Sequence, residues 1–271
     1  MLQGNRQLEL QFVTEKYSQL LVLSPHMDDA VLSCGGFISA ASQKMRCVTL
    51  TLCTSDPDLE VNEAPPHGIA LPSERRHEEA AAMEALGCEL IQLDFMDAIY
   101  RKDRRGEKKS LYPTLDSLWS MPVEGDLHYR NVLSQKIQPV LKSFESAPTL
   151  ILTPAGVGHH VDHILCTQTL LSLVPDLGSV MLYEDFPYVV DQGEHLGVSD
   201  SIGAALQRLN LRGMERFEFY SNIDAKASLI RNYPSQLDTI FGGANHIQSV
   251  LAKSGVENTA VERFWQVERG N

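Results

Sequence analysis

Short apolar runs that alternate with helical patterns constrain the fold of this chain more than any other feature. The apolar runs predict five strands, at 19–24, 46–53, 89–94, 148–153 and 179–184. Helical spacing occupies four of the intervening segments, at 30–43, 73–86, 130–145 and 161–174. Because the runs are continuously apolar rather than alternating, both faces of the sheet are expected to be covered by helices. The alternation therefore predicts an α/β fold with a mostly parallel sheet flanked by helices.

The length of 271 residues fits one such domain over the whole chain. We expect a core over about 18–185 and a C-terminal helical elaboration over 186–271. The elaboration is predicted to hold helical pieces at 200–210 and 224–233 and a final helix from 257.

Charge and hydropathy narrow the functional class. The net charge of −12 argues against nucleic-acid binding and against adhesion to anionic membranes. The sequence contains no run of about 18 apolar residues, so no transmembrane segment is expected. The first residues also lack the pattern of a signal peptide. Five scattered cysteines without a CxxC pair predict buried free thiols. These features together predict a cytoplasmic protein.

Two long segments interrupt the alternation. Residues 54–72 are acidic and contain prolines, and residues 98–126 include the basic stretch "RKDRRGEKK". Irregular segments of this length are usually functional or disordered, so we expect them to form the walls of a substrate cleft. The basic stretch would suit an anionic group on a substrate, or it is simply a solvated surface. Neutralising Arg101, Lys102, Arg104 and Arg105 should raise KM for an anionic substrate if the first interpretation holds.

Polar side chains gather directly after two predicted strands. His26, Asp28 and Asp29 follow the first strand, and "GHHVDH" (158–163) follows the fourth. In open α/β sheets, ligand sites form beyond the carboxyl ends of the strands. Imidazole and carboxylate groups suit zinc, and a catalytic zinc needs only three protein ligands. The sequence therefore predicts one metal site built from both segments, although iron or manganese would also fit the spacing.

A simpler explanation is open for each cluster. Asp28 and Asp29 would also serve as caps for the helix that begins near Val31. His160 and His163 would also be ordinary polar residues at a helix start. His159 is expected to contact solvent or other protein groups rather than a metal.

Three motifs resemble those of the LmbE-like, or PIG-L, deacetylases. The stretch "SPHMDDAVLSCGG" is similar to their (A/S)HPDDE motif, and "HHVDH" is similar to their HxDH motif. Between them, "RRHEEAAAMEALG" fits the linking pattern R-x-x-E-x3-A-x3-L-G. The family includes GlcNAc-phosphatidylinositol de-N-acetylases and the deacetylases of the mycothiol and bacillithiol pathways. The resemblance covers residues 20–166 and implies a Rossmann-like fold.

The resemblance also implies roles for individual residues. One Zn²⁺ per chain would be bound by His26, Asp29 and His163. Asp28 would be the general base, and His160 would stabilise the oxyanion or protonate the leaving amine. The implied role of Asp162 is to fix the orientation of His160.

Other positions bear on the substrate or depart from the family pattern. Arg75 and Asp97 match family positions that contact substrate. Met27 replaces the usual proline and Ala30 the usual glutamate, at positions not expected to bind metal. Some relatives place a tyrosine before the second motif, and this chain does not. Tyr183 and Tyr188 of "YEDFPY" (183–188) are candidates for that function, or the stretch is structural.

The predicted function is zinc-dependent hydrolysis of the N-acetyl group of an amino sugar or amino-sugar conjugate. The alternative within the same chemistry is an esterase or amidase acting on a non-sugar acyl substrate. A nucleotide-binding module is disfavoured because "SPHMDDA" occupies the turn where GxGxxG is needed. A non-catalytic relative is disfavoured because the implied base and ligands are all present. A homo-oligomer is possible through "ELIQL" (89–93) or "TAVERFWQVE" (259–268), although core burial explains both equally well.

Overall fold

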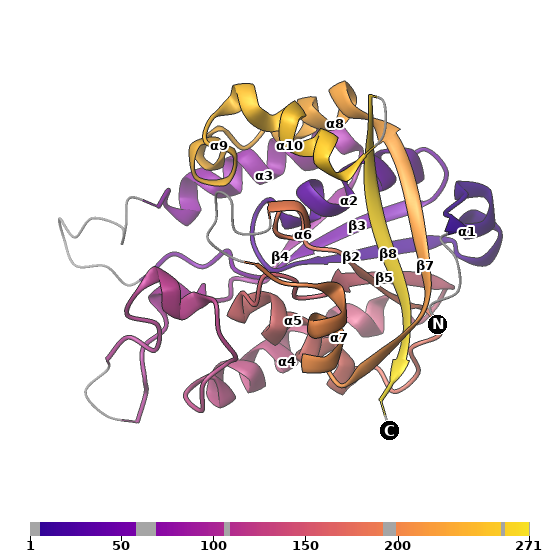
Figure 1. Cartoon of the computed structure of the whole chain (residues 1–271). Coiled ribbons are helices and arrows are strands. Elements are labelled where there is room, and N and C mark those ends of the chain that lie inside the picture. The colour runs from indigo at the N-terminus through magenta and orange to yellow at the C-terminus, as the bar shows by residue number, and fades with distance from the viewer. Residues whose placement is uncertain (1–5, 58–68, 106–108, 192–198, 256–257, 271) are drawn as a thin grey trace.

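One twisted sheet organises the molecule. Figure 1 shows the computed structural model, which describes residues 6–57, 69–105, 109–191, 199–255 and 258–270. Within these residues, eight strands pair in the order β1-β7-β8-β6-β5-β2-β3-β4. The strands are β1 (Arg6–Gln7), β2 (Gln19–Ser24), β3 (Arg46–Thr51), β4 (Glu89–Gln92), β5 (Thr149–Pro154), β6 (Val180–Tyr183), β7 (Leu211–Asn222) and β8 (Thr259–Arg269).

The centre of the sheet is parallel, as the apolar runs predict. β2 pairs in parallel with β3 and β5, β3 pairs with β4, and β5 pairs with β6. Five of the six residues of β2 are buried, so this strand contributes to the core on both faces. All five predicted strands are present.

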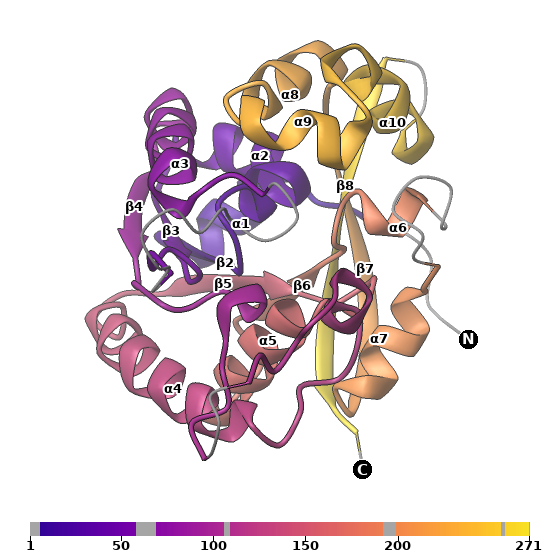
Figure 2. The same cartoon turned by 90° about the vertical axis from the view of Figure 1, so that its left-hand side faces the viewer.

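Helices cover both faces of the sheet (Figures 1 and 2). Helices α2, α3 and α8–α10 lie on one face, whereas α4, α5 and α7 lie on the other. The four helices predicted between the strands are all present. The helices are α1 (Leu10–Lys16), α2 (Asp29–Ala41), α3 (Pro72–Leu86), α4 (Asp126–Ser143), α5 (Val161–Leu173), α6 (Tyr188–Asp191), α7 (Ile202–Arg208), α8 (Ile223–Ile230), α9 (Pro234–Phe241) and α10 (Ile247–Ser254). Short 3-10 helices form at η2 (Ala98–Tyr100), η3 (Leu115–Leu118) and η4 (Ala244–His246).

The C-terminal part of the chain completes the sheet, which corrects the helical prediction for it. The predicted final helix from 257 is wrong, because residues 259–269 form β8. This strand is antiparallel to both β6 and β7. Its valines and aromatic residues favour a strand, and Phe264 and Trp265 are buried between the helical layers. Core burial therefore accounts for "TAVERFWQVE", whereas β4 forms an edge of the sheet. The helical pieces predicted at 200–210 and 224–233 correspond to α7 and α8.

A glycine and a buried ion pair fix α2 against the C-terminal part. A Cβ atom at Gly36 would lie 2.5 Å from Oγ of Ser221 in β7, so only glycine permits this close approach. The amide of Gly36 donates to Glu262 in β8 at 2.7 Å, and Glu262 also pairs with Lys226 of α8. "CGG" (34–36) thus serves helix packing.

Two further sequence predictions concern thiols and membrane spans. All five cysteines are unpaired and buried, as predicted. Among the described residues, no helix combines the length and apolarity needed to cross a bilayer.

The two long segments are only partly described. Residues 58–68 and 106–108 lie outside the described residues, and the first of these ranges is most of the acidic segment 54–72. The remainder of 98–126 contains η2 and η3.

Candidate active site

The two polar clusters meet at the carboxyl end of the parallel strands. His26 follows β2, whereas His160 and His163 follow β5, the neighbouring strand. The ring of His26 lies 4.7 Å from that of His160 and 5.4 Å from that of His163, measured between centroids. All three side chains are buried. Segments 130 residues apart in sequence thus form one site, at the place expected for a parallel sheet.

Asp29 lies between two of these imidazoles. Its Oδ2 atom is 3.1 Å from Nδ1 of His26 and 3.3 Å from Nε2 of His163. Donor atoms bound tetrahedrally to zinc at 2.0–2.1 Å are separated from one another by about 3.3 Å. Oδ2 of Asp29 therefore lies at the donor-to-donor separation of a zinc site from each of the two imidazole nitrogens.

The second nitrogen of each imidazole contacts another buried carboxylate. Nε2 of His26 lies 3.2 Å from Oδ2 of Asp162, and Nδ1 of His163 lies 2.6 Å from Oδ1 of Asp185. A carboxylate at the far nitrogen is the usual partner of a metal-binding histidine, because it fixes the tautomer. Both histidines are thus oriented with one nitrogen toward Asp29.

Asp28 contacts an arginine instead of capping its helix. It occupies the N-cap position of α2, but its side chain makes no capping hydrogen bond. Oδ2 of Asp28 lies 3.2 Å from Nη2 of Arg75, and both side chains are more than nine-tenths buried. Burial raises the pKa of Asp28, and the Arg75 guanidinium opposes that effect. The capping explanation does not account for this residue.

His160 begins α5 and is held as a neutral hydrogen-bond donor. Its Nδ1 atom accepts a hydrogen bond from the backbone amide of Asp162 at 3.2 Å. Burial lowers the pKa of His160, and the neighbouring His26 and His163 add to the effect. A neutral imidazole whose Nδ1 accepts must carry its proton on Nε2.

The carboxylate of Asp162 serves His26 rather than His160. It accepts hydrogen bonds from Arg101 and from the backbone amide of Ala98, in addition to its contact with His26. Only the backbone of Asp162 bonds to the ring of His160. The role implied by the resemblance, that this carboxylate orients His160, therefore has no counterpart in these contacts.

Arg101 belongs to this buried network and not to a free basic surface. Its side chain is fully buried and pairs with both Asp126 and Asp162. The nearby Arg105 is exposed but pairs with Asp103 and Glu124. Because Arg101 is enclosed, it cannot contribute to binding an anionic substrate group from solvent.

The two predicted substrate residues lie beside the histidines. Oδ2 of Asp97 is 3.7 Å from Nε2 of His26, and its Oδ1 accepts from the amide of Ile99. Arg75 pairs with Asp28, but its Nε atom is buried and has no hydrogen-bond partner in the described part of the chain. A substrate hydroxyl or carbonyl would satisfy that atom.

Sequence reasoning missed two neighbours of the site, Asp185 and Trp119. Asp185 contacts His163 as described, and its only signal in the sequence was that it belongs to the acidic pair Glu184–Asp185 after β6. The ring of Trp119, from the segment 98–126, lies 5.1 Å from that of His160 and 5.3 Å from that of Tyr188. Tyr188 is also 6.0 Å from His163, whereas Tyr183 is buried and donates to the carbonyl of Leu23. Of the two candidate tyrosines, only Tyr188 therefore reaches the histidines.

His159 bonds to Arg208 and Asp200, away from the ligand atoms.

The cluster has the charge and the open donor atom that a divalent cation requires. Nε2 of His163 is buried and has no hydrogen-bond partner among the described residues. Burial alone would lower the pKa of His163, but Asp29 and Asp185 outweigh it and raise that pKa to about 9, so a cation that binds at Nε2 would displace a proton. Two guanidinium groups and two imidazoles of raised pKa, those of His26 and His163, lie among six carboxylates, those of Asp28, Asp29, Asp97, Asp126, Asp162 and Asp185. Potential donor atoms also come together in two overlapping groups, His26–His160–His163 and His26–Cys53–Asp162. Such a site favours added positive charge, and its donors are those of zinc.

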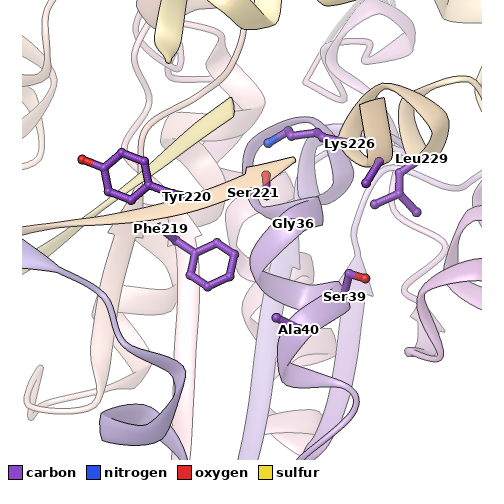
Figure 3. A pocket seen from close by; sticks show the side chains of 9 residues that line it. Gly36, Ser39, Ala40, Phe219, Tyr220, Ser221, Lys226 and Leu229 are labelled. Atoms are coloured by element: carbon purple, nitrogen blue, oxygen red, sulfur yellow. The ribbon is translucent and has the colours of Figure 1, made fainter. Parts of the chain in front are cut away.

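A separate cavity lies at α2, β7 and α8 (Figure 3). Phe219, Leu229 and Lys226 are among the residues that line it. None of the histidines or aspartates of the site lines this cavity.

Comparison with known proteins identifies the family of this chain and proteins that are similar to it. Residues 21–174 match the family model of PIG-L, described as GlcNAc-PI de-N-acetylase. The 2′-N-acetylparomamine deacetylase of Niallia circulans is 26% identical over 266 residues, which cover 90% of this chain and 89% of that protein. The protein of the same name from Streptomyces fradiae is 31% identical over 171 residues, covering 62% of this chain and 57% of that protein. A crystal structure of a zinc-inhibited form of teicoplanin deacetylase superposes with a TM-score of 0.68 at 23% identity, covering 93% of this chain and 99% of that one.

Proposed function

Because this chain belongs to the PIG-L family of GlcNAc-PI de-N-acetylases, and is therefore a deacetylase that hydrolyses amide bonds, we propose that it removes an N-acetyl group from an amino sugar or amino-sugar conjugate. The products would be a free amine and acetate. Similarity over most of the chain to a 2′-N-acetylparomamine deacetylase supports a substrate of the amino-sugar class. The alternative is an esterase or amidase reaction on a non-sugar acyl substrate.

His26, Asp29 and His163 are the residues proposed to hold a single zinc ion. The observation that carries the proposal is the position of Oδ2 of Asp29 between Nδ1 of His26 and Nε2 of His163. A zinc ion bound there would supply a water of lowered pKa and a Lewis acid for the amide carbonyl.

Asp28 is the proposed general base. Its contact with Arg75 fixes one carboxylate oxygen, and its place beside Asp29 sets it next to the proposed ligands. Asp28 would accept a proton from the attacking water and return it to the nitrogen of the departing amine. Because an amine leaves poorly without that proton, the same carboxyl group serves both halves of the reaction.

His160 is proposed to stabilise the oxyanion. Its proton lies on Nε2 because Nδ1 accepts from the backbone. A neutral N–H donor placed beforehand stabilises developing negative charge without reorganising at the moment of reaction. Removing one such donor typically lowers kcat by about 10²- to 10³-fold.

The proposal is tested by measuring zinc content and acetate release on the purified protein. The substrates are a panel of N-acetylated amino sugars, N-acetylated amino-sugar conjugates and acyl esters. We expect about one zinc per chain, acetate release from a sugar substrate, and loss of activity on chelation and in Asp28→Asn. Glu84→Gln, an exposed carboxylate change on α3, is the matched control and should retain activity. Zinc binding with turnover of esters or non-sugar amides alone would favour the alternative, and protein that folds but binds no zinc would overturn the mechanism.

A further inference from the structure

The segment that follows β6 contributes one carboxylate to the site, and this carboxylate is not part of the family motifs. Asp185 is 1% exposed and belongs to "YEDFPY", a stretch with no role in the mechanism above. Its two oxygens have different partners. Oδ1 lies 2.6 Å from Nδ1 of His163, and Oδ2 accepts from the amide of Val157 at 2.8 Å.

These two contacts determine the state of His163. A carboxylate next to Nδ1 favours the proton on that nitrogen, so Nε2 is the nitrogen that loses its proton when the imidazole binds a metal. Nε2 is the atom that faces Asp29 at 3.3 Å and has no hydrogen-bond partner among the described residues. The bond to Val157 ties the same carboxylate to the backbone three residues before His160, so Asp185 cannot rotate away from the imidazole without breaking it.

We propose that Asp185 is a positioning residue for metal binding, which holds His163 in the tautomer that ligates through Nε2. The inference rests on the proposed function, because it takes His163 as a metal ligand. Asp185 touches neither the metal nor the substrate in this assignment. It acts through His163, as Asp162 acts through His26 at the other side of Asp29.

Asp185→Asn is the informative substitution because it preserves size and removes the charge. The asparagine side chain has a single oxygen, which can accept a hydrogen bond from either His163 or Val157. It cannot accept from both, because the two donors lie on opposite sides of the group. If the amide nitrogen faces His163, it donates to Nδ1 and forces the proton onto Nε2, where it blocks coordination. Glu184→Gln is the matched control, because Glu184 is the adjacent buried carboxylate and accepts from Nε1 of Trp265 instead.

The experiment measures zinc affinity of the metal-free proteins by competition with a chromophoric chelator. Loss of a carboxylate partner of a metal-binding histidine typically lowers metal affinity by about 10- to 100-fold. We expect a loss of this size in Asp185→Asn and less than about threefold in Glu184→Gln. Equal zinc affinity of Asp185→Asn and the wild type would overturn the inference, even if the variant melts at a lower temperature. Absence of zinc binding by the wild type would instead overturn the proposed function.

A second measurement does not depend on the variant folding. Long-range ¹H–¹⁵N spectra of the zinc-loaded wild type report which nitrogen of His163 carries the proton. The inference requires a proton on Nδ1 and none on Nε2. A proton on Nε2, or coordination through Nδ1, would overturn it.

Discussion

Nη2 of Arg75 lies 3.2 Å from Oδ2 of Asp28, and both side chains are shielded from solvent. The contact joins the linking motif on α3 to the proposed general base at the start of α2. Replacing Arg75 by lysine should lower kcat/KM by about 10- to 100-fold, because a lysine cannot reproduce the planar, directed donors of a guanidinium. Arg76→Lys is the neighbouring control, since Arg76 is half-exposed and pairs with Asp56. Equal kcat/KM in the two variants would argue against a role for the Arg75–Asp28 contact.

Glu79 should make stability depend on pH. This residue of α3 is fully buried and accepts hydrogen bonds from Thr51 at 2.7 Å and from Tyr233 at 2.5 Å. Burial raises the pKa of Glu79 to about 7, although both hydrogen bonds oppose the shift. Between pH 4.5 and 7 the folded protein therefore binds more protons at this group than the unfolded chain, so the free energy of unfolding falls as pH rises.

The raised pKa of Glu79 contributes about 3 kcal/mol to the free energy of unfolding when the side chain is protonated. This contribution is fully present below the usual carboxyl pKa and is lost as the pH rises through 7. Glu79→Gln, which carries no charge, should gain about that much stability relative to the wild type between pH 4.5 and pH 8. Urea denaturation of metal-free protein across this range would measure it, with Glu84→Gln as the exposed control. Parallel stability curves for Glu79→Gln and the wild type would show that Glu79 does not titrate in this window.

Arg101 should matter for stability, whereas the exposed part of its segment should not. Arg101→Met leaves the buried carboxylates of Asp162 and Asp126 without their cation, a change that typically costs about 3 to 5 kcal/mol. Arg105→Met, at an exposed position of the same segment, should not change the urea midpoint measurably. If Arg101→Met unfolds at the wild-type urea concentration, the buried network contributes little to stability.

Trp119 should affect turnover through the surroundings of His160. Its ring packs edge to face against those of His160 and Tyr188. Trp119→Ala removes both aromatic contacts, each worth about 0.5 to 1.5 kcal/mol. We expect at least a tenfold loss of kcat/KM in Trp119→Ala and a smaller loss in Trp119→Phe. Met121→Ala, an exposed change two residues away, is the control, and a loss of the same size in that variant would point to a general effect on the segment.

The parallel core could be predicted from the sequence because its strands are apolar on both faces. The site could be located for a related reason, since His26, Asp28 and Asp29 directly follow one such strand and the second histidine cluster follows its neighbour. The antiparallel strands were missed. β7 carries charged residues such as Glu215 and Arg216, and a register shift between Gly213 and Glu215 interrupts its alternation. In β8, glutamates and arginines lie among the apolar residues at a spacing that also fits a helix.

The roles of Asp162 and Asp185 could not be predicted because they depend on which imidazole nitrogen each carboxylate contacts. Spacing along the chain does not contain that information. The burial of Arg101 was missed for a similar reason. A basic stretch predicts an exposed surface on average, but this guanidinium pairs with two buried carboxylates, one in α4 and one in α5, which the fold alone brings beside it.

The position of β8 constrains the order in which this chain can fold. Of the strands that the structure describes it comes last in sequence, yet it lies inside the sheet and separates β6 from β7. Until β8 has been synthesised, β6 has an open edge of unpaired amides and carbonyls. Pairing of β8 with β6 joins residues about 80 positions apart, a long-range contact that slows folding. The nascent protein must therefore keep an apolar, incomplete sheet from aggregating until β8 emerges and inserts.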